Sequence, residues 1–271
     1  MTVKKRSKDL KPVAELISLA GKRALITGSA GGIGRAMAYR FAEAGAELEL
    51  VDINARGLAA VKNELTSFNR EVNTYKIDIS SKEAIDGLWE RLKGREPDIL
   101  VNNAGIYPFK NFLDTDVAFL KNVMDINLQS AFLMCQHMIR SRLKKGGVII
   151  NVSSIEAIMP FAEGLVAYDI SKTGVIGLTR GLAKEYGKHG FRINCLIPGG
   201  INTPGTRAVA KQVAQFMFSL LRTGYNFKER LPMGRGGRPD EVARVALFLA
   251  SDLSSYVHGA LVAVDGGFLS A

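Results

Sequence analysis

The residues best suited to chemistry are a tyrosine and a lysine one helical turn apart, Tyr168 and Lys172. Residues i and i+4 of a helix share a face, so the two side chains are expected to be neighbours. A free phenol has a pKa of about 10 and is a poor base at neutral pH, but a neighbouring ammonium lowers that pKa. Because Ser154 ends an expected strand upstream, where parallel sheets present ligands, we favour a proton-exchanging site over a surface Tyr–Lys pair.

A second candidate is a glycine-rich turn between an expected strand and an expected helix. It reads Thr27-Gly28-Ser29-Ala30-Gly31-Gly32-Ile33-Gly34. Glycines let the backbone turn sharply and let a pyrophosphate approach, and the free N–H groups of the helix start attract the anion. An ordinary tight turn is the alternative for a glycine cluster that stands alone.

Asp52 ends the next expected strand and favours the nucleotide interpretation of that turn. A carboxylate there accepts hydrogen bonds from both hydroxyls of an adenosine ribose, and it repels a 2′-phosphate. Neither Gly31 nor Ile53 supplies a cation, and Arg56 lies a helical turn further on. The sequence therefore favours NAD over NADP.

Strand-like apolar runs alternate with helical patterns, which predicts an α/β fold. We expect a single-domain, doubly wound parallel sheet of Rossmann type, with about seven strands and helices on both faces. The expected strands are 23–27, 47–52, 72–78, 98–101, 148–152, 191–197 and 260–265. The expected helices are 33–44, 55–69, one from a Ser80–Glu83 capping box to Gly94, 115–143, 166–188 and 239–250.

Residues 19–271 are expected to form this domain after a basic extension, residues 1–18. Within the extension, residues 1–11 are expected to be disordered and 12–19 to form a short helix. Residues 202–235 interrupt the strand–helix rhythm beside a strand end, which is typical of a substrate lid. Its apolar side chains either cover a substrate or pack on the domain or a neighbouring subunit; they are Val213, Phe216, Met217, Leu220, Leu221, Tyr225 and Phe227.

Charge and cysteine content narrow the class of protein. The net charge is +10, partly from the basic N-terminus, which we interpret as a solvated end rather than an attachment to nucleic acid. The longest strictly apolar run has six residues, whereas a membrane helix needs about 20. Cys135 and Cys195 have no metal-ligand or disulfide spacing, so buried thiols in a reducing cytoplasm are expected. We predict no metal, membrane or nucleic-acid partner.

Several motifs follow one another in the order typical of the classical short-chain dehydrogenase/reductase (SDR) family, which the sequence resembles from about residue 19 to 268. They are Thr27-Gly28-x-x-x-Gly32-Ile33-Gly34, Asn102-Asn103-Ala104-Gly105, Asn127, Ser153-Ser154, Tyr168-x-x-x-Lys172, Pro198-Gly199 and Val264-Asp265-Gly266-Gly267. The resemblance implies an oxidoreductase that transfers a hydride between NAD(H) and a secondary alcohol or ketone of the sugar, polyol or cyclic alcohol class. It also implies a small-molecule substrate and a homotetramer or dimer.

The resemblance assigns roles residue by residue. Tyr168 exchanges the hydroxyl proton, Ser154 hydrogen-bonds the reacting oxygen, Lys172 also holds the nicotinamide ribose, and Asn127 supports a water-linked proton path. The cofactor set is Gly28, Ser29, Gly31, Gly32, Ile33, Gly34, Asp52, Ile53, Asp78, Ile79, Asn103, Ala104, Gly105, Tyr168, Lys172, Pro198, Gly199, Ile201 and Thr203. The substrate set is Tyr107, Ser154, Glu156, Phe161, Tyr168 and Gly200. Glu156 either binds a sugar hydroxyl or an amine, or points to solvent.

One spacing departs from the family pattern. Ser154 and Tyr168 are 14 residues apart, one more than usual, and Ser153 is further still. We interpret this as a one-residue insertion around Ala162 and Glu163 that alters one pocket wall.

Two other functions stay open. One is an NADPH-dependent 3-oxoacyl thioester (acyl-carrier-protein) reductase, whose acidic carrier would suit a positive surface, although Asp52 argues against NADPH. The other is an NAD sensor without turnover, against which the intact Ser154, Tyr168 and Lys172 argue.

Overall fold

The sheet that the sequence predicts is present. The computed structural model describes residues 10–203 and 230–271. In this part of the chain, seven parallel strands form one sheet in the order β3-β2-β1-β4-β5-β6-β7. They are β1 (Arg23–Thr27), β2 (Glu47–Asp52), β3 (Val72–Lys76), β4 (Ile99–Asn102), β5 (Gly147–Val152), β6 (Phe191–Pro198) and β7 (Leu261–Val264). The order reverses at β1 and β4, so a crevice opens at their carboxyl ends.

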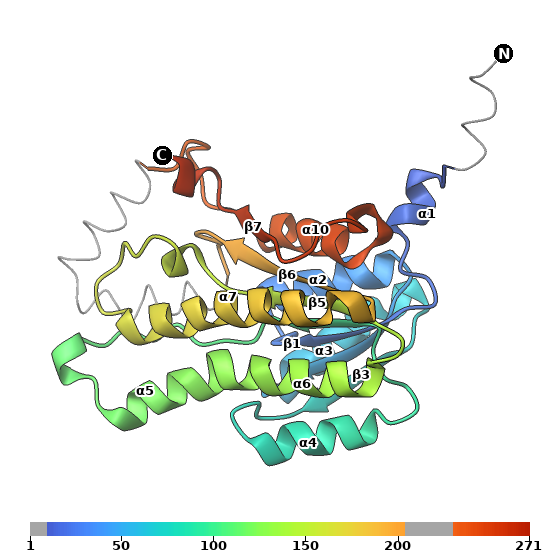
Figure 1. Cartoon of the computed structure of the whole chain (residues 1–271), viewed down its shortest axis with the longest axis horizontal. Coiled ribbons are helices and arrows are strands. Elements are labelled where there is room, and N and C mark those ends of the chain that lie inside the picture. The colour runs from blue at the N-terminus through green and yellow to red at the C-terminus, as the bar shows by residue number, and fades with distance from the viewer. Residues whose placement is uncertain (1–9, 204–229) are drawn as a thin grey trace.

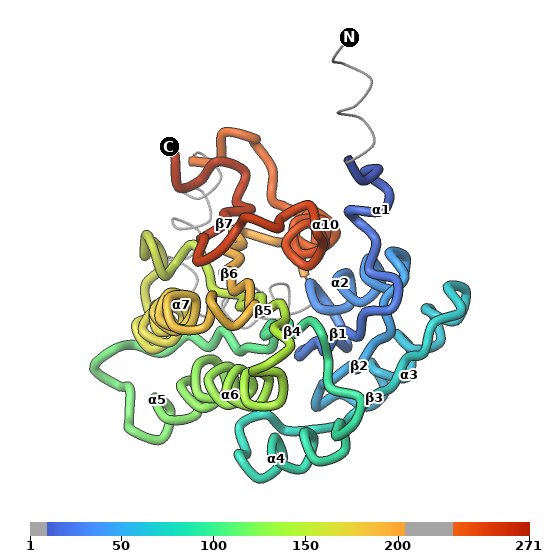
Figure 2. Tube along the Cα trace, turned by 45° about the vertical axis from the view of Figure 1, so that its right-hand side comes forward, coloured from blue at the N-terminus to red at the C-terminus, as the bar shows by residue number. Residues whose placement is uncertain are grey.

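Helices cover both faces of the sheet (Figures 1 and 2). The α-helices of the described residues are α1 (Val13–Ile17), α2 (Gly32–Glu43), α3 (Ala55–Glu64), α4 (Lys82–Arg91), α5 (Val117–Met124), α6 (Ser130–Arg142), α7 (Val166–Tyr186) and α10 (Pro239–Ala250). Helices α2, α3 and α10 pack on one face and α4, α6 and α7 on the other. Along β1, Ala24 and Ile26 enter the first core and Leu25 the second, as strand alternation requires.

Three expected elements need correction. The helix expected over 115–143 is two α-helices, α5 and α6, joined by a π-helical turn at Asp125–Gln129. The helix expected over 55–69 ends at Glu64 and continues as a 3₁₀ turn, Leu65–Phe68. The cap of α4 is Ser81, not Ser80, because the Ser81 hydroxyl accepts from the Ala84 N–H at 3.1 Å while Ser80 hydrogen-bonds Asp78.

The chain around the expected lid is described only at its two flanks. Ile201 and Gly237 form a parallel bridge, and the Asn202 N–H donates to the Gly237 carbonyl at 2.9 Å. Residues 204–229, which hold most of the expected lid and all of its apolar side chains named above, lie outside the described residues, as do residues 1–9 of the basic extension. The short helix expected over 12–19 is present as α1.

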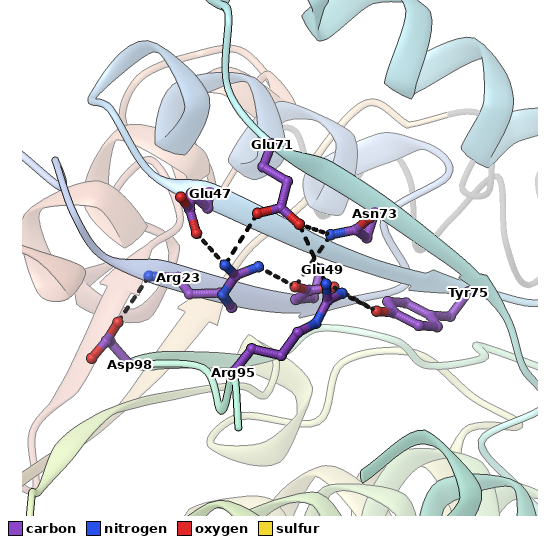
Figure 3. A network of polar contacts seen from close by, with 8 residues as sticks. All are labelled: Arg23, Glu47, Glu49, Glu71, Asn73, Tyr75, Arg95 and Asp98. Atoms are coloured by element: carbon purple, nitrogen blue, oxygen red, sulfur yellow. Dashed lines mark hydrogen bonds and ion pairs between the residues drawn. The ribbon is translucent and has the colours of Figure 1, made fainter. Parts of the chain in front are cut away.

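A buried charge network joins β1, β2 and β3 at the end of the sheet away from the crevice (Figure 3). Glu49 of β2 is fully buried, and its carboxylate accepts from Arg23 at 2.5 Å, Tyr75 at 2.7 Å, Arg95 at 3.1 Å and Asn73 at 3.4 Å. A charge so placed is tolerated only when several donors surround it. Glu47 and Glu71, which are partly exposed, also bind Arg23. The network thus ties three strands together through one carboxylate.

Within residues 10–203 and 230–271, no helix is both long and apolar enough to span a bilayer. Within the same ranges, His, Cys, Asp and Glu side chains nowhere gather in a group of three or more that would hold a metal ion. Both cysteines are free and buried.

Candidate active site

The carboxyl ends of β4, β5 and β6 open into a cavity of about 650 Å³. Parallel strands end together, so loops distant in sequence meet there. The predicted residues that line the cavity are Ile33, Asn103, Gly105, Tyr107, Ser154, Glu156, Phe161, Tyr168, Lys172, Pro198, Gly199, Gly200, Ile201 and Thr203. All six residues of the predicted substrate set line the cavity, together with 9 of the 19 residues of the predicted cofactor set.

Ser154, Tyr168 and Lys172 converge on one wall of this cavity. The Ser154 hydroxyl lies close enough to Tyr168 to lower the pKa of its phenol, and the Lys172 ammonium lies 5.9 Å from the centre of the Tyr168 ring. Ser153 points elsewhere, donating to the Lys172 carbonyl at 2.8 Å. Ser154 is thus the serine that meets Tyr168, despite the longer spacing.

Burial controls the protonation of this group. Burial raises the pKa of Tyr168, and the nearby Ser154 hydroxyl opposes the rise. Burial also lowers the pKa of Lys172 to about 8, which favours its neutral form. The net direction for Tyr168 is opposite to the lowering expected from Lys172 alone, because desolvation penalises a buried phenolate.

Asn127 lies in the π-helical turn between α5 and α6 and is buried. Its side-chain oxygen accepts from the Ile106 N–H at 2.8 Å, and its amide donates to the Ile106 carbonyl at 3.0 Å and to Ser171 at 3.1 Å. The turn therefore links the loop after β4 to the helix that carries Tyr168. The extra residue of a π-turn is typical of functional sites.

The glycine turn has the shape of a phosphate cradle. Helix α2 begins at Gly32, and no side chain forms a capping hydrogen bond there. The N–H groups of its first turn are therefore available to donate to an anion. A Cβ atom on Gly34 would lie 2.1 Å from the Gly28 carbonyl oxygen, whereas one on Gly31 would meet nothing within 4 Å. Close packing thus surrounds Gly34, and open space lies over Gly31. These residues fit a dinucleotide pyrophosphate.

Asp52 stands beside that turn. Its carboxylate accepts from the Ala30 N–H and the Asn54 N–H, both at 2.9 Å, and the residue is partly exposed. Each carboxylate oxygen has a further lone pair for a ribose hydroxyl. Ile53 is exposed, whereas Ser29 is buried and its hydroxyl donates to the Val51 carbonyl.

The segment after β4 joins the two halves of the site. The Asn103 amide donates to the carbonyls of Thr27 and Gly28, and Ala104 packs against Gly28. A Cβ on Gly105 would lie 3.1 Å from Asn127 Oδ1 and 3.2 Å from Lys172 Nζ, so a larger residue there would press on both side chains.

Asp78 and Ile79 of the predicted cofactor set follow β3, outside the lining of the cavity. Asp78 is exposed and accepts from Ser80, and Ile79 is buried in the core beneath the sheet. Thr203, by contrast, lies near Gly32, 3.5 Å from the position of its missing Cβ.

The substrate side of the cavity holds aromatic and acidic groups. The rings of Tyr107 and Tyr168 meet edge to face with 4.7 Å between their centres. Glu156 is buried rather than solvent-exposed, and burial raises its pKa to about 7. Sequence reasoning missed Asp169, whose partly buried carboxyl follows Tyr168 and has a pKa raised by burial to about 6. Its position directly after Tyr168 was the available signal.

Known proteins share this architecture. A family model described as enoyl-(acyl carrier protein) reductase matches residues 28–269. The 3-oxoacyl-[acyl-carrier-protein] reductase FabG of Aquifex aeolicus is 35% identical over 255 residues, covering 93% of this chain and 98% of that protein. The 2-dehydro-3-deoxy-D-gluconate 5-dehydrogenase of Bacillus subtilis is 35% identical over 260 residues, covering 94% and 98%.

A solved structure agrees with these relatives. A short-chain type dehydrogenase/reductase from Mycobacterium marinum superposes with a TM-score of 0.87 at 30% identity, covering 96% of this chain and 100% of that one. With the sheet order, the glycine cradle and the Ser154, Tyr168 and Lys172 cluster, these matches identify the chain as a member of the short-chain dehydrogenase/reductase family.

Proposed function

We propose that the chain transfers a hydride between NAD(H) and a secondary alcohol or its ketone. Oxidoreduction of CH–OH groups with NAD(P) is the chemistry of its family. The observation that carries the proposal is the meeting of Ser154, Tyr168 and Lys172 in one cavity with the glycine turn beside it. When bound, the nicotinamide supplies the two-electron hydride acceptor or donor.

The chain's own residues position the substrate and move its proton. The Tyr168 hydroxyl gives a proton to, or takes one from, the substrate oxygen, and Ser154 donates a hydrogen bond to that oxygen. Lys172 is buried beside Tyr168, with its ammonium donating to the Val152 carbonyl at 2.9 Å. It favours the phenolate and binds the nicotinamide ribose. Asn127 holds the loop after β4 and supports a water-linked proton path.

The preference for NAD rests on Asp52. Its carboxylate stands at the end of β2 next to the turn, where a 2′-phosphate would meet a negative charge. The alternative is NADPH-dependent reduction of a 3-oxoacyl thioester, supported by the likeness to FabG and by the net charge of +10, which suits an acidic carrier.

Cofactor titration tests this choice. A titration with NADH or NADPH, followed by nicotinamide fluorescence, should show that NADH binds more tightly. In Asp52→Ala the ratio of the NADPH and NADH dissociation constants should fall by about 10-fold or more. Tighter NADPH binding to the wild type would refute the role of Asp52 and turn the substrate search to ketones and acyl thioesters.

Tyr168→Phe should keep NADH binding while turnover collapses. Full activity in that variant would refute the mechanism, and a wild type that binds NADH without any turnover would support a sensor.

We also propose that copies of the chain associate as a homotetramer or dimer through α6 and α7. Their outer faces form an apolar groove in which Phe132 is 49% and Leu143 is 42% exposed. Light scattering after size-exclusion chromatography measures the mass of the assembly, and a monomer would refute the proposed association.

We further propose that residues 19–271 act as one domain with a lid near 202–235. The two buried free thiols suit a reducing cytoplasm.

A further inference from the structure

Glu156 has one carboxylate oxygen in use and one without a partner. It follows Ser154 in a short 3₁₀ turn, Ile155–Ala157, and its N–H donates to the Ser154 hydroxyl at 3.2 Å. Its Oε2 accepts from the Phe161 N–H at 3.0 Å, which anchors the loop between the turn and α7. Its Oε1 is buried and has no hydrogen-bond partner among the described residues. The residue is 1% exposed and lines the cavity.

A structural role explains the position of Oε2 but not the burial of Oε1. Anchoring the loop uses the Oε2 that accepts from the Phe161 N–H, while the nearby Ala162 N–H also lowers the pKa of the carboxyl, and an amide oxygen would serve that purpose without burying a charge. A buried acceptor left unpaired destabilises the folded protein. A ligand that donates a hydrogen bond in the cavity would remove this penalty.

The charges around the cavity restrict that ligand. Among the described lining residues, Glu156 is the only acid and Lys172 the only base. Lys172 already donates to the Val152 carbonyl and lies by Tyr168. Asp169 of α7 acts on Glu156 electrostatically and raises its pKa further. A substrate carboxylate next to Glu156 would therefore meet negative charge and no described counter-ion.

We propose that Glu156 Oε1 accepts a hydrogen bond from a second, uncharged hydroxyl of the substrate, so that the enzyme prefers neutral diols and polyols to mono-alcohols and hydroxy acids. The inference rests on the proposed function, since the reacting carbinol must sit at Ser154 and Tyr168. Glu156 lines the same cavity as Ser154 and donates its N–H to the Ser154 hydroxyl, so we place the second hydroxyl on a carbon near the reacting one. That hydroxyl is not oxidised. With NAD⁺ bound, oxidation would move a hydride from the reacting carbon to the nicotinamide and the O–H proton to the ionised Tyr168, which becomes the neutral phenol, and would yield a hydroxyketone.

Three probes on one ring separate these substrate classes. They are cyclohexanol, trans-cyclohexane-1,2-diol and trans-2-hydroxycyclohexane-1-carboxylate, assayed by NADH formation at alkaline pH with saturating NAD⁺. The wild type should oxidise the diol with a kcat/KM roughly 10-fold or more above that of cyclohexanol. The hydroxy acid should be the poorest of the three.

Two variants separate hydrogen bonding from charge. Glu156→Met keeps the length but removes the acceptor, and it should abolish the diol preference mainly through KM. Glu156→Gln removes the charge and keeps an oxygen for the Phe161 N–H, and it should improve the hydroxy acid about 10-fold relative to the diol. Glu90→Gln, an exposed change on α4, is the matched control and should alter no ratio. NADH affinity and melting temperature check that each variant is folded.

The outcomes are distinct. No diol preference in the wild type, or a preference that survives Glu156→Met in a folded protein, overturns the inference. If only cyclohexanol is oxidised, the role of Glu156 fails while the proposed function stands. If NADH binds and no probe is oxidised, diol addition should still perturb the fluorescence of the wild-type complex and not that of Glu156→Met; no such difference also overturns it. Failure to bind NADH refutes the proposed function itself.

Discussion

Glu49→Gln tests whether one buried carboxylate holds three strands together. The change keeps the size of the side chain and removes its charge. In the wild type, Glu49 accepts from two guanidinium groups, Arg23 at 2.5 Å and Arg95 at 3.1 Å, and from the Tyr75 hydroxyl. In the variant an amide N–H group must face one of these donors.

The structure sets the size of the effect. The Glu49 side chain is 0% exposed and that of Arg23 is 15% exposed, so water compensates little for the lost partner. Breaking a buried ion pair by removing one member costs about 3–5 kcal/mol. Glu47 binds the same guanidinium but is 40% exposed, and an exposed pair contributes about 0–1 kcal/mol. Glu47→Gln is therefore the matched control.

Urea denaturation at one fixed protein concentration measures both variants. Glu49→Gln should lower the free energy of unfolding by about 3–5 kcal/mol, and Glu47→Gln by less than about 1 kcal/mol. NADH affinity should not change in either, because Arg23 and Glu47 lie at the amino ends of β1 and β2, whereas the cavity lies at the carboxyl ends of the strands. Equal, small losses in the two variants would refute the reasoning.

Three further predictions concern single contacts. Gly34→Ala should weaken NADH binding by about 10-fold or more, because its Cβ would lie 2.1 Å from the Gly28 oxygen; unchanged affinity in a fluorescence titration contradicts this. Burial raises the pKa of Glu156 from its ordinary 4.5 to about 7, so the folded protein holds that proton more tightly than the unfolded chain. Stability from this group is therefore fully present below pH 4.5 and is lost as the pH rises through 7, by about 3 kcal/mol in all. Urea melts across that range should show a larger loss in the wild type than in Glu156→Gln, which keeps the contribution of Asp169, whose pKa burial raises to about 6; parallel curves would exclude a role for Glu156. Arg192→Met should cost about 2–3 kcal/mol, because Arg192 donates to carbonyls at the end of α10, and a melting temperature equal to that of the wild type would argue against this role.

Local sequence patterns were sufficient for most of the fold. Strands β1 and β2 begin and end at the predicted residues: β1 holds a short apolar run, and in β2 the apolar residues alternate with Glu47 and Glu49 before Val51. The glycine turn and the Tyr168–Lys172 pair are likewise local, because their spacing alone sets their geometry. The order of the motifs along the chain was enough to indicate the family.

Other features depend on contacts between distant segments. The π-turn at Asn127 exists because its side chain binds Ile106 and Ser171, and no periodicity in 115–143 signals that break. The direction of the Tyr168 pKa shift, the burial of Glu156 and the surroundings of Asp169 follow from desolvation, which only packing creates. Sequence alone therefore determined which groups are present and on which elements they stand. Tertiary structure decided which of them lose water, because burial is a property of the whole assembled fold rather than of neighbouring residues.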